Sequence, residues 1–165
     1  MGQVISLEDL VREREAARAS GKRFVFTNGC FDLLHRGHVE LLKAAKAKGD
    51  ILCVAVNSDS SVRRLKGERR PIITQADRAA VLAALEAVDY VVIFDEDTPA
   101  EVISRLRPDV LVKGSDYSTG QIVGREVVEG DGGVVVRFPR VGGLSTEKLL
   151  TEIAGRYKDL VKPDS

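Results

Sequence analysis

The chain carries two histidines, His35 and His38, and both stand in the tetrad His-Arg-Gly-His. A spacing of three places both imidazoles on one face of the first turn of a helix. The start of a helix attracts anions through its N–H groups and its dipole, and Gly37 lets a phosphate approach the backbone closely. Histidine donates hydrogen bonds to phosphate oxygens and becomes cationic as charge builds up. We therefore predict a phosphate site that contains His35, Gly37 and His38.

Other chemistries find less support in the same residues. One alternative is that the two histidines have no shared function, and another is that they bind zinc. The spacing differs from HExxH and no third ligand is nearby, so we expect no resident metal. The chain lacks GxGxxG, GxxxxGK[ST] and GxSxG, which argues against a dinucleotide fold, a P-loop and an acyl-transfer serine. We interpret Cys30 as a packing or backbone-contact residue rather than as a nucleophile.

A second chemical feature is a run of five cations, predicted to lie on an exposed loop: Arg63, Arg64, Lys66, Arg69 and Arg70. Cations beside a phosphate site neutralise the charge of a triphosphate in the transition state. We select Lys66, which precedes Gly67, for this role. Arg78 falls in the first turn of the next predicted helix, where it opposes the helix dipole, so we expect either a bound anion or a structural carboxylate beside it.

The elements that position these residues alternate between strands and helices. Strands are predicted at 23–28, 51–57, 90–94, 109–113 and 133–138, and helices at 6–20, 37–48, 74–88, from 98 onward, and 145–157. This alternation predicts an α/β fold, a Rossmann-like three-layer α/β/α sandwich with a five-stranded, mostly parallel sheet. Ligands of such sheets bind beyond the carboxyl ends of the strands, which selects the segments 27–38, 57–71, 113–117 and 140–146.

Composition limits the function classes. The 165 residues are expected to form one domain over 1–165, with a core at 23–153, an N-terminal helix at 6–20 and a frayed tail at 160–165. The 25 Lys and Arg balance 25 Asp and Glu, which argues against binding of long nucleic acids. No apolar run approaches ~18 residues. The two cysteines show no CxxC spacing, so we expect reduced thiols and a cytoplasmic protein without a membrane partner.

Two segments carry a resemblance to a known family. Thr27-Asn-Gly-Cys-Phe-Asp-Leu-Leu-His-Arg-Gly-His38 and Gly143-Leu-Ser-Thr146 resemble the HxGH and Gly-Ile-Ser-Thr signatures of the cytidylyltransferase-like nucleotidyltransferases. Within that group the chain is similar to the adenylyltransferases that make ADP-heptose, which are often fused behind a sugar kinase. Supporting segments include Pro108-Asp-Val-Leu-Val-Lys-Gly-Ser-Asp-Tyr117, and the likeness runs from about Arg23 to Ile153. No kinase segment is present, so the chain resembles a stand-alone form.

The resemblance implies that AMP passes from ATP, accompanied by Mg²⁺, to D-glycero-β-D-manno-heptose 1-phosphate with release of pyrophosphate, for lipopolysaccharide core synthesis, in a homodimer. It implies catalytic roles for His35, His38 and Lys66, and sugar-phosphate contacts from Asp32, Asn57 and Lys66. The nucleotide-binding set, to which we add Arg78, is Thr27, Asn28, Gly29, Cys30, Phe31, His35, Gly37, His38, Lys113, Gly114, Asp116, Arg140, Gly143, Leu144, Ser145 and Thr146. Relatives commonly have a third hydroxyl where this chain has Glu147, and Ser145 and Thr146 alone would also serve as plain helix caps.

Two further hypotheses stay open. One is a cytidylyltransferase that acts on glycerol 3-phosphate or a similar alcohol phosphate, and the other is a non-catalytic nucleotide sensor that uses the same pocket. For either enzyme no covalent intermediate is needed, because the acceptor phosphate is already a nucleophile. The protein then aligns the acceptor with the α-phosphate and stabilises charge.

Overall fold

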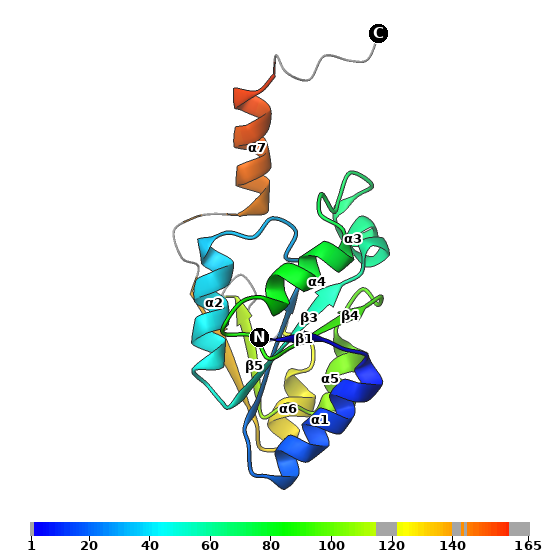
Figure 1. Ribbon diagram of the computed structural model, residues 1–165, viewed down its shortest axis with the longest axis vertical. Helices are drawn as coiled ribbons and strands as arrows, with labels where there is room; N and C mark the ends of the chain where they lie inside the picture. Colours follow the sequence, from blue (N-terminus) through cyan, green and yellow to red (C-terminus); the bar gives the residue numbers. More distant parts are fainter. Residues whose placement is uncertain (1, 115–121, 140–142, 144, 159–165) are drawn as a thin grey trace.

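A single parallel sheet forms the centre of the molecule in the computed structural model, which describes residues 2–114, 122–139, 143 and 145–158. Its six strands are β1 (Gln3–Val4), β2 (Phe24–Gly29), β3 (Ile51–Asn57), β4 (Tyr90–Phe94), β5 (Val110–Gly114) and β6 (Val134–Phe138). Their order is β1-β4-β3-β2-β5-β6, and every neighbouring pair is parallel (Figure 1). The predicted count of five strands is therefore wrong by one. The missed strand β1 has two residues, both exposed, and so shows no apolar run.

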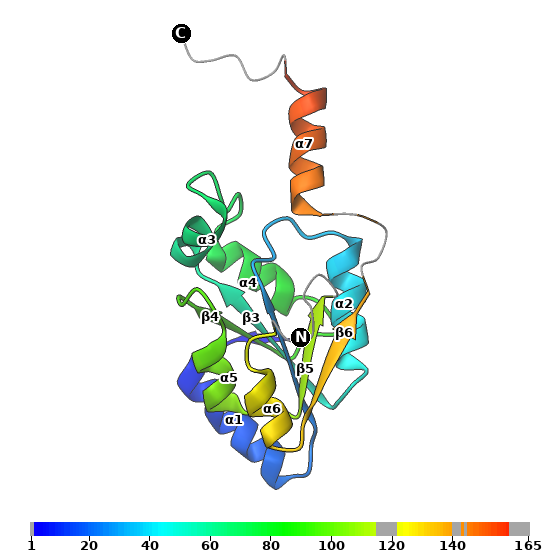
Figure 2. The same cartoon turned by 180° about the vertical axis from the view of Figure 1, so that it is seen from behind.

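Helices cover both faces of the sheet, as predicted. They are α1 (Leu7–Ala19), α2 (Arg36–Lys46), α3 (Asp59–Lys66), α4 (Gln75–Ala83), α5 (Ala100–Leu106), α6 (Arg125–Gly130) and α7 (Thr146–Arg156). One face carries α2 and α4 over a buried cluster that includes Leu42 and Leu82, and the other carries α1, α5 and α6 over a cluster that includes Leu10 and Ile103 (Figures 1 and 2). The sequence pattern predicted no element at α6, which has six residues.

Helix caps explain most of the boundaries. Ser6 accepts a hydrogen bond from Asp9 N at the start of α1, as the capping box predicted, and Thr74 accepts one from Asp77 N at the start of α4. At α5 the N-cap is Pro99 rather than Thr98, so the helix begins one residue later than expected. These local signals therefore place helix starts to within about one residue.

The predicted loop at 63–71 is partly wrong. Helix α3 begins after Ser58, whose hydroxyl accepts from Ser61 N, and it buries Val62. It continues through Lys66 and ends at Gly67, which has a φ of 95° that glycine adopts without strain. The first three cations of the run therefore lie on a helix, where their side chains have defined directions.

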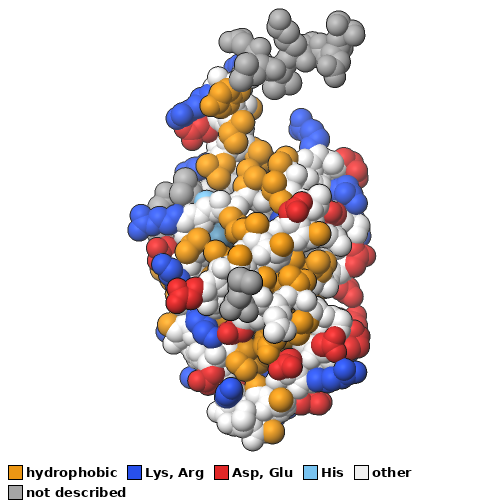
Figure 3. Space-filling model, in the orientation of Figure 1, with side chains coloured by type: hydrophobic (Ala, Val, Ile, Leu, Met, Phe, Trp, Pro, Cys, Tyr) orange, Lys and Arg blue, Asp and Glu red, His pale blue; other side chains and the backbone are white. Residues whose placement is uncertain are grey.

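Helix α7 stands beyond the carboxyl ends of the strands, away from the body of the sheet (Figure 1). None of its residues is buried, and Ile153 and Tyr157 are about half exposed (50% and 51%). The space-filling view shows apolar side chains along it (Figure 3). Among the described helices none is long and apolar enough to cross a membrane.

Candidate active site

A cavity of about 320 Å³ opens where the ladder between β2 and β5 stops. These strands pair at Val25↔Val110 and Phe26↔Leu111, and the pairing ends there. Beyond it, Thr27 and Asn28 of β2 and Lys113 of β5 line the cavity together with Asn57 of β3. We call this the strand-end cavity. It lies where the strand order reverses, which is the usual ligand position in open parallel sheets.

A second and wider cavity, of about 810 Å³, lies between the loop after β2, the loop after α3 and the first turns of α7. We call it the helix cavity. Its lining residues are Cys30, Phe31, Asp32, His38, Lys66, Arg70, Ser145, Thr146, Glu147, Lys148, Thr151 and Glu152. Two of these, Cys30 and Lys66, also line the strand-end cavity. The two cavities are therefore adjacent at this pair of residues.

The two histidines form a stacked pair at the start of α2. Their ring centroids are 3.9 Å apart with an angle of 26° between the planes. His35 is the N-cap, and its Nδ1 accepts from Gly37 N at 3.1 Å, while Nδ1 of His38 accepts a longer bond of 3.4 Å from His35 N. Because each Nδ1 accepts, the proton of each neutral ring is on Nε2, where it is available to a ligand.

These contacts revise the predicted anion site. The N–H groups of Gly37 and His38 already bond to His35 Nδ1 and His35 O, so they are not free for a phosphate in this conformation. The Nε2–H groups of the imidazoles remain as side-chain donors. His38 lines the helix cavity, whereas His35 lines neither cavity and contacts the site through its stacking on His38.

Burial favours the neutral form of both imidazoles. Burial lowers the pKa of His35, and burial together with the neighbouring His35 lowers the pKa of His38 to about 4. Phe31 packs its ring 5.3 Å from the His38 ring and is itself buried. Its φ of 48° lies in the left-handed region, which a non-glycine residue adopts at a cost, as is common at functional sites.

The cations near the cavities differ in their partners. Arg64 pairs with Asp97 at 2.7 Å, and Arg70 pairs with the buried Asp32. Lys66 lies at the end of α3 and is exposed, and its side chain has no hydrogen bond or ion pair with any residue that the structure describes. Of the cations that line the two cavities, Lys66 alone lines both, which fits the role predicted for it.

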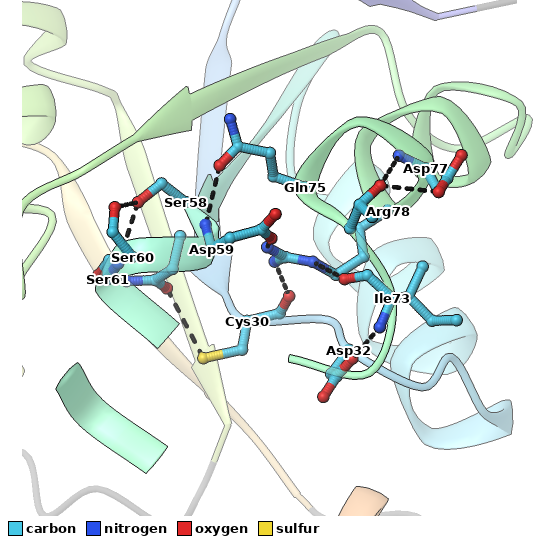
Figure 4. A network of polar contacts seen from close by, with 12 residues as sticks. Cys30, Asp32, Ser58, Asp59, Ser60, Ser61, Ile73, Gln75, Asp77 and Arg78 are labelled. Carbon is cyan, nitrogen blue, oxygen red and sulfur yellow. Dashed lines mark hydrogen bonds and ion pairs between the residues drawn. The ribbon is translucent and has the colours of Figure 1, made fainter. Parts of the chain in front are cut away.

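Arg78 cross-links three segments from a buried position. Its guanidinium donates to Asp59 Oδ1 at 2.8 Å, to Ile73 O at 2.9 Å and to Cys30 O (Figure 4). The side chain is 0% exposed. Of the two partners expected from the sequence, the structure therefore places the carboxylate there. We correct the predicted nucleotide contact to a role in holding the loop around Cys30 against α3 and α4.

Asp32 has a similar role. Its carboxylate is 0% exposed and accepts from Ile72 N and from Arg70. It also accepts from Ile73 N (Figure 4). Burial by itself raises the pKa of Asp32, but the bonds from Ile73 N, Ile72 N and Arg70 outweigh this and hold it below its usual value. Asp32 therefore fixes the loop that presents Arg70, and it also lines the helix cavity, so its predicted sugar-phosphate contact stays a prediction.

The strand-end cavity collects the remaining predicted residues of β2, β3 and β5. Asn57 donates to Ser61 Oγ at 3.0 Å, and its Oδ1 lies 3.9 Å from Cys30 Sγ. Burial raises the pKa of the Cys30 thiol, which therefore stays protonated and is a poor nucleophile, in line with the sequence interpretation. Gly29 and Gly114 also line this cavity. Burial lowers the pKa of Lys113 to about 8.

At α7, Ser145 and Thr146 line the helix cavity, and Ser145 Oγ also caps the helix by accepting from Lys148 N at 3.1 Å. The expected helix cap is therefore present, whereas the phosphate contact predicted for this hydroxyl stays a prediction. Glu147 lines the same cavity. Gly143 has a φ of 63° and lines neither cavity. Three predicted residues, Asp116, Arg140 and Leu144, lie outside the described residues.

Sequence reasoning missed several lining residues. Arg70 was treated as part of a solvated loop, although it lines the helix cavity. Asp97, Thr98 and Pro99 line the strand-end cavity. They follow β4, and the rule about carboxyl ends of strands would have selected them had it been applied to that strand. Ile122 and Val123 have no comparable local signal. Within the described residues no group of three or more His, Cys, Asp or Glu could hold a metal ion.

Comparison with known proteins places the fold and the family. The family model described as cytidylyltransferase-like matches residues 26–153. The bifunctional protein HldE of Geobacter metallireducens is 54% identical over 155 residues, and that of Nitrobacter hamburgensis is 55% identical over 151. These matches cover 94% and 92% of this chain. The chain spans about a third of the length of these relatives (32% and 31%).

Two solved structures share the architecture. A lipopolysaccharide core biosynthesis protein from Thermoplasma volcanium is 28% identical with a TM-score of 0.60, covering 73% of this chain and 97% of its own. A pantoate-beta-alanine ligase from Francisella tularensis has a TM-score of 0.66 at 14% identity, covers 99% of this chain and 80% of its own, and supports the fold alone. The matched residues include His38 of the HxGH tetrad and the start of α7, which line the helix cavity. The chain belongs to the cytidylyltransferase-like family of nucleotidyltransferases.

Proposed function

We propose that the protein transfers AMP from ATP to D-glycero-β-D-manno-heptose 1-phosphate and releases pyrophosphate, in the cytoplasm, to supply heptose for lipopolysaccharide cores. The observation that carries this proposal is the junction of two cavities at Lys66. The wide helix cavity has His38, Arg70 and the hydroxyls of α7 for a triphosphate, and the smaller cavity has room for a sugar. The relatives named HldE and the lipopolysaccharide core biosynthesis protein support heptose as the sugar.

In this mechanism an oxygen of the acceptor phosphate attacks the α-phosphorus of ATP. The bond from that oxygen to phosphorus forms as the bond from phosphorus to the α–β bridging oxygen breaks, and pyrophosphate carries the electron pair away. His38 Nε2–H donates to the phosphates, and Lys66 stabilises the charge that spreads over the transferred group. Mg²⁺ enters with the triphosphate as part of the substrate.

A cytidylyltransferase acting on an alcohol phosphate is the second candidate, and the family name favours it. The described cavity residues do not distinguish adenine from cytosine by any contact. The two proposed functions are therefore distinguished by an activity assay rather than by the geometry of the site. A homodimer also stays a prediction, which sedimentation of the purified chain checks.

The decisive experiment mixes the protein with Mg²⁺, each nucleoside triphosphate in turn and a panel of sugar 1-phosphates and alcohol phosphates, and measures pyrophosphate. We expect turnover with ATP and the manno-configured heptose 1-phosphate. Preference for CTP with glycerol 3-phosphate would replace this function by the second candidate. Binding of ATP without turnover on any acceptor would indicate a nucleotide sensor.

A further inference from the structure

Two buried polar atoms of the strand-end cavity lack partners. Thr27 Oγ1 and Asn28 Oδ1 are shielded from solvent, and neither makes a hydrogen bond within the part of the chain that the structure describes. Thr27 is 0% exposed, and both residues line the cavity. Buried polar groups in folded proteins are nearly always paired, so these two atoms point to a ligand that completes them.

The kinds of atom left unpaired restrict the ligand. An amide oxygen only accepts hydrogen bonds, so Asn28 Oδ1 needs a donor, and a fully ionised phosphate offers none. A hydroxyl both donates and accepts, and thus satisfies Asn28 Oδ1 and Thr27 Oγ1 alike. Lys113, nearly buried on the neighbouring strand, adds a donor to the same cavity. The set therefore matches vicinal hydroxyls of a sugar better than a phosphate.

The size and the surroundings of the cavity agree with a monosaccharide. Its volume of about 320 Å³ is at the small end of the range for ligand sites, about 300–1,000 Å³. Leu65, Ile122 and Val123 give it an apolar side for the C–H groups of a sugar ring. Its opening toward the helix cavity passes Cys30 and Lys66, so a sugar on the floor directs its phosphate to the cation at the junction.

We propose that Thr27, Asn28 and Lys113 form a hydroxyl-binding floor that selects a polyhydroxylated sugar phosphate over a simple alcohol phosphate. This inference deepens the proposed function and rests on it. It moves Thr27, Asn28 and Lys113 from the predicted nucleotide set to the acceptor side. A site built to bond hydroxyls rejects analogues that lack them, because its buried polar groups are then left unpaired.

The test uses binding, so that it does not depend on turnover. The affinity of the full chain for β-D-mannose 1-phosphate, its monodeoxy analogues and glycerol 3-phosphate is measured by calorimetry, in parallel with the affinity for ATP. Thr27→Val keeps the side-chain shape and removes Oγ1. We expect it to weaken mannose 1-phosphate binding at least about tenfold and to leave ATP binding within about twofold. Ser145→Ala, in the helix cavity, is the matched control, and we expect the opposite pattern.

The deoxy analogues sharpen the result. For the analogue that lacks the hydroxyl bound by Thr27, Thr27→Val and the wild type bind equally, whereas for the other analogues the variant remains weaker. Lys113→Met provides a second variant with the same expected pattern if Thr27→Val does not fold, as judged by its melting temperature.

Three outcomes overturn the floor. The first is an unchanged affinity for mannose 1-phosphate in both variants. The second is a loss of affinity for ATP in place of mannose 1-phosphate, which would place the nucleotide in this cavity. The third is that the wild type binds no sugar phosphate. The proposed function has its own criterion, the pyrophosphate assay. An active enzyme with an unaffected Thr27→Val therefore refutes the floor alone.

Discussion

The two cavities share Cys30 and Lys66 but are built in different ways. The strand-end cavity is small and floored by strand ends, and its polar atoms are buried and in part unpaired. The helix cavity is wider and is assembled from a loop, two helix starts and charged side chains. Sheet backbone holds atoms rigidly, which suits recognition of shape and hydroxyl position, whereas a cleft lined by charged side chains suits a polyanion.

The difference extends to how each region is held in place. The floor of the strand-end cavity needs only the sheet, whose pairing β2↔β3 continues to Gly29↔Val56. The walls of the helix cavity depend on side chains, because Asp32 and Arg78 connect the loop after β2 to the segment that carries Arg70. Substitutions on the two sides are therefore expected to affect different substrates.

The largest expected effect is on the histidine pair. His38→Ala and, through the lost stacking, His35→Ala remove donors that act on the phosphates in the transition state. We expect kcat to fall at least about 10²-fold in each, while the fold stays intact. Steady-state assays with saturating ATP and circular dichroism check this. Near-normal turnover in both variants would separate the histidines from catalysis and refute the assignment of the helix cavity to the triphosphate.

Lys66 tests whether the two cavities meet functionally. Lys66→Met removes the charge at the junction and keeps most of the stem, so we expect kcat/KM to fall about 10- to 10²-fold for both substrates. Arg63→Met is the matched control, because Arg63 is an exposed cation of the same helix and lines neither cavity. An effect confined to one substrate would show that Lys66 serves only one cavity.

The two cavities also differ in how many of their features could be predicted from the sequence. The strands at 51–57 and 90–94 and the caps at Ser6, Ser145 and Thr74 are local patterns, and the structure has them where they were predicted. The HxGH tetrad could be singled out as a candidate phosphate site because its residues are neighbours in sequence.

Partners distant in sequence were beyond such patterns. Asp32 and Arg78 carry charges of ordinary appearance, and their roles come from Arg70 and Cys30, which are 38 and 48 positions away. The hydroxyl-binding floor could not be predicted from the sequence for the same reason. Lys113 and Thr27 line one cavity only because β5 lies next to β2 in the sheet. Local sequence shows which residues are polar, whereas pairing between strands decides which of them meet.

Stability tests the loop connection. Asp32→Asn keeps the shape of the side chain but removes the charge that binds Arg70, so we expect a loss of about 2 kcal/mol in the free energy of unfolding. Asp9→Asn, at an exposed cap, is the control and should cost about 0.5 kcal/mol or less. Guanidinium unfolding at pH 7 measures both. Equal losses would mean that the buried pair does not hold the loop.

The sign of the pH dependence follows from the lowered pKa of Asp32. A carboxylate with a folded pKa below its unfolded value of about 3.9 contributes stability above that value, and the contribution is lost as pH falls through the folded pKa. The difference between the wild type and Asp32→Asn is therefore expected to be full at pH 6 and to shrink below about pH 4. A difference that is constant across this range would assign the loss to packing rather than to charge.

The smallest effect is a shift in the ionisation of His38. Its pKa of about 4 reflects burial and the neighbouring His35, so the ring is neutral near pH 7 when the chain is alone. A triphosphate beside Nε2 favours the charged imidazolium, so ATP should raise this pKa by at least about one unit. Ring-proton NMR titration of the wild type with and without ATP, with the His35→Ala spectrum for assignment, measures the shift. Mannose 1-phosphate alone is expected to leave the His38 titration in place because it occupies the other cavity. If the sugar phosphate and not ATP shifted the pKa of His38, the sugar phosphate would be assigned to the helix cavity and ATP to the strand-end cavity.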